Sequence, residues 1–140
     1  MTNSWTEPMR SLVGDARGWA GVWTLTYATG VALQRLAMVE RWDEDLTLTY
    51  AGLDVALAAS ELEWADPTGT AQAPRVDLGP CVPPERRAAI AVALQMLANG
   101  LELLTALLTD PAMPAGKVLS GTRAFGLLAG AERSLRAGST

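Results

Sequence analysis

Five aromatic side chains form the pattern in this sequence that most resembles a binding site. They are Trp19, Trp23, Tyr27, Tyr50 and Trp64. The first three recur at every fourth residue, so they would line one face of a helix, and the last two are predicted on the inward face of the next helix. Together they could wall an apolar cavity in which indole N–H and phenol O–H groups orient a ligand. Aromatic residues at helical spacing more often form an ordinary core, and the sequence favours that explanation over a cavity.

Asp54 is the charge that interrupts the most apolar part of the second predicted helix. On a helix it shares a face with Thr47 and Glu61, and we expect that face to be solvated. If the carboxylate pointed inward instead, it could act as a general acid or base, with Arg35 or Arg123 as its partner. The candidate ligand-binding set therefore consists of the five aromatic residues together with Asp54 and Arg123.

The chain contains no histidine and a single cysteine, Cys81. Without histidine there is no Ser-His-Asp or Cys-His nucleophile, no histidine general base and no His-ligated zinc. A lone cysteine cannot form an internal disulfide, and no histidine is present to activate it. We expect no metal and no cofactor. Whether the chain is an enzyme stays open, since any catalysis would have to rest on a carboxylate, a tyrosine or the shape of a pocket.

The net charge of −4 and the pI of about 4.7 argue against a nucleic-acid partner, because such partners require a positive surface. The first residues lack the basic and apolar regions of a signal peptide. Residues 18–34 carry no charge, but this run is shorter than the roughly 20 residues of a typical membrane span. We therefore expect no integral membrane segment and a cytoplasmic location. Ten arginines against one lysine suggest a GC-rich genome, such as an actinobacterial one.

Apolar residues at three- and four-residue spacing predict an all-α protein with four long helices. We expect these helices over residues 4–41, 43–64, 84–109 and 114–136, with a break possible near residue 15. Five of the eight prolines fall within residues 65–84, which we predict as a Pro/Gly-rich linker. Short connections on either side of this linker predict two helical hairpins. Joined by the crossover, they would form one antiparallel four-helix bundle, a single domain over residues 1–140.

Two threonine-rich segments support an alternative fold. Trp23–Tyr27 and Leu46–Tyr50 alternate threonine with apolar or aromatic residues, which is typical of short amphipathic strands. The alternative is therefore an α+β fold with two short strands. Two strands alone make a marginal sheet, so we prefer the all-α fold.

Two of the predicted helices have narrow polar faces. In residues 43–64 the polar side is nearly confined to Thr47, Asp54 and Glu61, and residues 88–101 carry no charge. A surface helix of a monomer normally has a broad polar side, and four helices cannot all be central. We therefore expect a homodimer or another protein partner to cover one side of the domain.

Three functions are compatible with these features. The leading hypothesis is a small non-catalytic helical bundle that acts by self-association and by protein or ligand binding. The alternative is a His-free enzyme or carrier for an apolar small molecule, of the cyclase or isomerase type found in bacterial secondary metabolism, with a pocket lined by Trp and Tyr. A peripheral membrane protein would also tolerate narrow polar faces.

Overall fold

The computed structural model describes residues 6–39, 46–75 and 86–138, and these residues form six α-helices. The helices are α1 (Thr6–Asp15), α2 (Gly18–Val39), α3 (Thr47–Ala65), α4 (Pro67–Ala71), α5 (Arg86–Leu108) and α6 (Ala115–Gly138). None of the residues in these ranges is in a strand. The all-α prediction is therefore confirmed. The α+β alternative is wrong, because one threonine-rich segment lies inside α2 and the other spans the start of α3.

The single helix expected over residues 4–41 is divided into α1 and α2. The division falls at Ala16 and Arg17, and Gly18 follows with a φ of +64°, a left-handed conformation that favours glycine. The first turn of α2 lies close against the backbone of Ala16 at Gly21. This approach requires a residue without a Cβ, because a Cβ on Gly21 would lie only 2.9 Å from the Ala16 carbonyl carbon. The helix break that the sequence permits near residue 15 is thus present.

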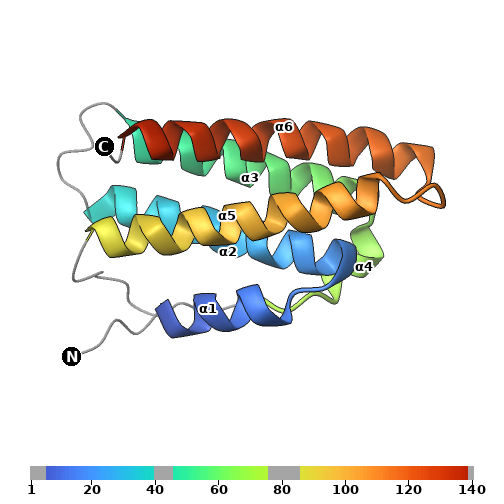
Figure 1. Ribbon diagram of the computed structural model, residues 1–140, viewed down its shortest axis with the longest axis horizontal. Coiled ribbons are helices and arrows are strands. Elements are labelled where there is room, and N and C mark those ends of the chain that lie inside the picture. The colour runs from blue at the N-terminus through green and yellow to red at the C-terminus, as the bar shows by residue number, and fades with distance from the viewer. Residues whose placement is uncertain (1–5, 40–45, 76–85, 139–140) are drawn as a thin grey trace.

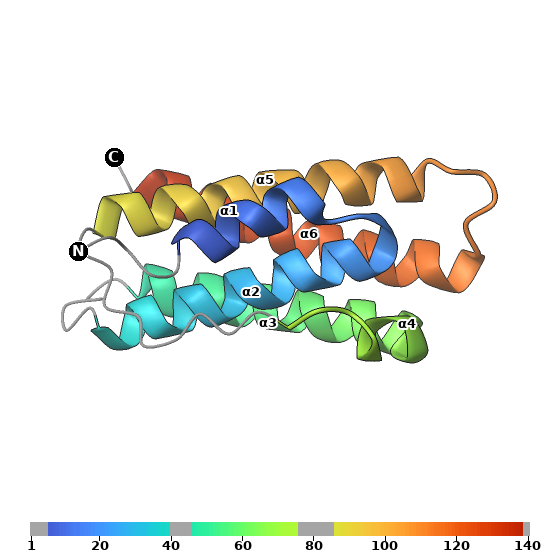
Figure 2. The ribbon, with the colours of Figure 1, turned by 90° about the horizontal axis from the view of Figure 1, so that it is seen from below.

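The four long helices lie side by side along the long axis of the molecule, and the two short ones pack at its edges (Figures 1 and 2). Both α2 and α6 contact α3 and α5, whereas α3 and α5 do not contact each other. The short helix α1 packs on α5 and α2, and α4 packs on α2 and α3. Part of the predicted linker is therefore helical. Its residues 76–85 lie outside the described part of the chain.

Small residues on α3 allow α2 to approach closely. The buried face of α3 is formed by Leu48, Ala51, Gly52, Val55, Ala58, Ala59 and Leu62. A Cβ on Gly52 would lie 3.5 Å from Leu33 Cβ, and one on Gly30 would lie 3.4 Å from Val55 Cγ1. Because alanine and glycine let helix backbones come together, this small-residue face is the one that α3 turns toward the core.

Candidate functional site

Trp19, the first aromatic residue of the candidate set, is built into the core. Its ring is 6% exposed, and its indole Nε1 donates a hydrogen bond to the carbonyl oxygen of Leu62, at 3.0 Å. Gly121 of α6 packs over the ring, since a Cβ there would lie 3.3 Å from Trp19 Cη2. Trp19 thus joins α2 to α3 and α6 and leaves no room for a ligand beside it.

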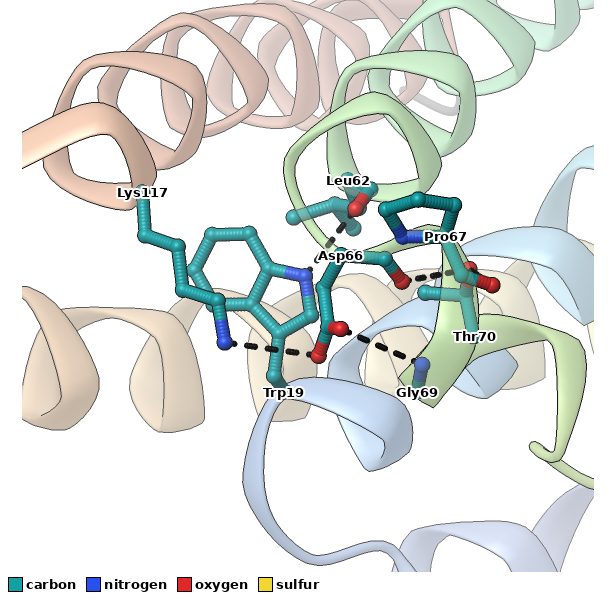
Figure 3. A network of polar contacts seen from close by, with 7 residues as sticks. All are labelled: Trp19, Leu62, Asp66, Pro67, Gly69, Thr70 and Lys117. Carbon is teal, nitrogen blue, oxygen red and sulfur yellow. Dashed lines mark hydrogen bonds and ion pairs between the residues drawn. The ribbon is translucent and has the colours of Figure 1, made fainter. Parts of the chain in front are cut away.

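A polar network around Asp66 surrounds this tryptophan (Figure 3). Asp66 Oδ1 accepts a hydrogen bond from the backbone N–H of Gly69, at 3.1 Å, and so caps α4. Its Oδ2 accepts a hydrogen bond from Lys117 Nζ of α6, at 3.3 Å. The same ammonium lies 5.4 Å from the centroid of the Trp19 ring. The network therefore ties α2, α4 and α6 together near the end of α3.

We expect Asp66→Ala to lower the free energy of unfolding by about 1–2 kcal/mol, because the change removes both a helix cap and the partner of Lys117. Urea denaturation followed by circular dichroism measures this loss. Lys117→Met is the matched control: it keeps an apolar stem near Trp19 and should cost less than about 1 kcal/mol. If Asp66→Ala left the free energy of unfolding unchanged, the network would not stabilise the helix ends.

Trp23 packs in the core, and Tyr27 stacks on it at the edge of a hollow. Their rings stack with centroids 5.0 Å apart, and the Arg75 guanidinium lies over both, 5.1 Å from the Trp23 ring. Trp23 is fully buried, and its Nε1 has no hydrogen-bond partner among the described residues. Tyr27 is half-buried and lines a hollow of about 280 Å³ between α2 and α3. The predicted aromatic pocket between the first two long helices is thus reduced to this hollow.

The prediction that Tyr50 and Trp64 face inward is wrong. Tyr50 is 58% exposed and Trp64 is 84% exposed. Both lie on the side of α3 opposite its small-residue face, so they cannot share a pocket with Trp19 and Trp23. The two polar members of the set lie nearer the surface as well, since Asp54 is half-buried and Arg123 of α6 is exposed.

The residues around Tyr50 and Trp64 form a continuous apolar surface on α3, which we call the outer α3 stripe. Its members are Tyr50, Leu53, Leu57 and Trp64 of α3 together with Leu46, which precedes the helix with a φ of +57°, and each is between 43% and 84% exposed. They follow one another at spacings of four, three, four and seven residues, and Ser60 occupies the position between the last two. Such spacing keeps side chains on one face of a helix and is the pattern of helices that pair. Both faces of α3 therefore carry large apolar residues: Leu48, Val55 and Leu62 lie in the core among alanines and a glycine, whereas the outer α3 stripe is exposed.

A groove adjoins one end of this stripe, between α3 and α6. It has a volume of about 460 Å³ and is lined by Leu57, Ser60, Glu61, Trp64, Arg123 and Leu127. Two members of the candidate ligand-binding set, Trp64 and Arg123, thus meet here. Leu57 and Leu127 were not in that set, because a leucine at core spacing gives no signal of a binding role. Leu57 is exposed because the opposite face of α3 packs in the core, and Leu127 of α6 is half-buried at the other side of the groove.

The side chains at this surface are mostly apolar, with acids along α3. α3 carries three acids, Asp54, Glu61 and Glu63, and no basic residue. Across the described ranges, no three His, Cys, Asp or Glu side chains gather as a metal site would require. The outer α3 stripe and its groove offer apolar contact area, with Glu61 and Arg123 supplying charge at the edge.

Comparisons with protein-family models, curated proteins and solved structures find no match to this chain. Within the described residues, one helical stretch, Arg87–Leu108 of α5, is long and apolar enough to cross a membrane by length and composition. Because α5 contacts α1, α2 and α6, it is also placed as a core helix would be. This stretch is weak evidence for a membrane span.

Proposed function

We propose that this chain is a non-catalytic association protein that binds a second copy of itself through the outer α3 stripe. The observation that carries the proposal is the burial pattern of α3. Four large apolar side chains of α3 lie in solvent along one face, directly opposite its packed face, and Leu46 is exposed just before the start of the helix. Exposed apolar patches of this kind mark interaction surfaces.

The remaining helices serve in this proposal as the scaffold of the stripe. We infer that α2, α3, α5 and α6 act as one antiparallel bundle of two hairpins. The contacts of α2 and α6 with both α3 and α5 support this arrangement, as does the short connection between Leu108 and Ala115. A stripe carried on such a scaffold is held straight before the partner arrives, which lowers the entropic cost of binding.

The area and charge of the stripe favour a protein over a membrane surface. Its exposed side chains amount to on the order of 600 Å² per copy, and a stable complex buries roughly 800 Å² on each partner. The adjoining groove supplies further area. Helices that lie on membranes carry Lys and Arg beside their apolar face, and α3 carries neither.

The second candidate is a carrier for an apolar small molecule. The groove favours it, because it brings Trp64 and Arg123 together beside two leucines, and its volume lies in the range of ligand pockets. The packed surroundings of Trp19 and Trp23 limit this function to the groove.

Native mass spectrometry of freshly purified protein tests both functions. Self-association predicts a species of two chains, each of 14.8 kDa, with no added mass. A one-chain species that carries a co-purified compound would overturn self-association in favour of the carrier. One-chain protein without added mass, at micromolar concentration, would contradict both proposals.

A further inference from the structure

We infer that two copies pair with their α3 helices antiparallel, and that Tyr50 of each copy inserts into the groove of the other between α3 and α6. The inference rests on the proposed self-association and names its geometry. It uses three observations: the spacing of the outer α3 stripe, the sizes of its members, and the position of the groove at one end of it.

With Ser60 counted between Leu57 and Trp64, the positions along the stripe are spaced by four, three, four, three and four residues, which is symmetric about the centre. When α3 is laid antiparallel on its own copy, Leu53 meets the partner's Leu57, Tyr50 meets the partner's Ser60, and the partner's Trp64 lies beside the start of the helix, where Leu46 precedes it. A two-fold axis produces each of these contacts twice, so one helix face satisfies both copies. The whole stripe is covered in this register.

The sizes of the side chains fit this register better than a parallel one. The only small position in the stripe, Ser60, falls opposite Tyr50, so the large ring enters the space that the small residue leaves. In a parallel pair Tyr50 would meet the partner's Tyr50, and Ser60 would meet the partner's Ser60. The contacts of Tyr50 with Tyr50 and of Trp64 with Trp64 would then hold the helices apart while a gap stayed open at Ser60, and such uneven packing is unfavourable.

The groove provides a place for the incoming tyrosine. Ser60 lies in its lining together with Leu57 and Trp64, and it also lines the smaller hollow between α2 and α3, so a side chain directed at Ser60 reaches the edge that the two spaces share. A volume of about 460 Å³ is ample for one tyrosyl side chain. The phenol O–H would then meet the carboxylate of Glu61 as an acceptor and the guanidinium of Arg123 as a donor. Tyrosine suits this position because its ring is apolar and its tip is polar.

Disulfide trapping tests the register. In a Cys81→Ser background, only the introduced thiols can react. A mixture of Tyr50→Cys and Ser60→Cys chains should cross-link within the pair, because the antiparallel register brings these positions together. This mixed pair keeps one native contact between Tyr50 and the partner's Ser60. The Ser60→Cys chain alone should not cross-link, since its two thiols would lie roughly 15 Å apart at 1.5 Å per residue, and a disulfide needs Cα atoms within about 7 Å.

The outcomes separate this inference from the proposed function. Efficient cross-linking of the mixture, at least tenfold faster than of Ser60→Cys alone, supports the antiparallel pair. Faster cross-linking of Ser60→Cys alone would show a parallel pair and overturn the inference while leaving self-association intact. If neither sample cross-links and both are one-chain species by light scattering, self-association fails together with the inference. If neither cross-links but both remain two-chain species, the copies pair through another face and both statements are wrong.

Discussion

The Leu57→Asp variant is expected to be a monomer at concentrations at which the native chain is a dimer. Leu57 lies at the centre of the outer α3 stripe and also lines the groove. In the pair it contacts the partner's Leu53, so the substitution buries two uncompensated carboxylates near the two-fold axis. Burying an unpaired charge costs several kcal/mol, and we expect the dissociation constant to rise at least about 100-fold. Sedimentation velocity over a concentration series measures this change.

Ala98→Asp is the matched control for this variant. Ala98 is exposed on α5, a helix that does not contact α3. The Ala98→Asp substitution introduces the same charge and a similar modest cost in helix propensity away from the stripe. It should therefore leave the dissociation constant unchanged within about twofold. Equal weakening by both substitutions would mean that added negative charge acts through overall repulsion. That result would remove the support for a specific surface on α3.

Trp23→Ala is expected to lower the free energy of unfolding by about 3–5 kcal/mol, because it removes a fully buried ring and leaves a cavity. The substitution also takes away the ring on which Tyr27 stacks and over which Arg75 lies. Since a small domain is stable by only about 5–15 kcal/mol in total, the variant should be close to unfolding. Urea denaturation in the Leu57→Asp background measures the loss without a contribution from dissociation.

Trp64→Ala in the same background provides the contrast. Trp64 is 84% exposed, so its removal should change the free energy of unfolding by no more than about 0.5 kcal/mol. In the native background the same change should weaken self-association, because an exposed tryptophan at an interface is a typical energetic anchor. If Trp23→Ala costs less than about 1 kcal/mol, the ring does not stabilise the core as described.

The helices could be predicted from sequence because the signals for them are local. Apolar spacing locates the ends of α3, α5 and α6 to within a few residues, and Gly18 marks the break before α2. The short helix α4 was missed. Its start depends on Asp66 capping the N–H of Gly69, and prolines in the same segment pointed to an irregular linker.

The orientation of α3 could not be predicted, because both of its faces are apolar. Apolar residues at three- and four-residue spacing predict the packed face, and Tyr50 and Trp64 were predicted to face inward because they follow that spacing. In the structure, close approach to α2 decides the orientation, and Gly52 and Gly30 make that approach possible. Which of two apolar faces packs depends on the neighbouring helix, so the pattern of one helix alone cannot decide it.

The candidate ligand-binding residues do not lie together in the structure, because the face of α3 that carries Tyr50 and Trp64 is turned away from α2. Trp19 and Trp23 became core residues, whereas Trp64 and Arg123 line one groove. Asp54, the other charged member, is half-buried and does not line that groove. The expectation of a partner, which came from the narrow polar face of residues 43–64, does not depend on which apolar face is exposed. The proposed self-association places the expected partner on the outer α3 stripe.

Light scattering of the native chain and of Leu57→Asp, each at tens of micromolar, is the most direct test of the claim that the outer face of α3 is an interface. The account predicts about twice 14.8 kDa for the native chain and 14.8 kDa for the variant. A native chain of 14.8 kDa, or a variant that keeps the mass of the pair, would contradict it.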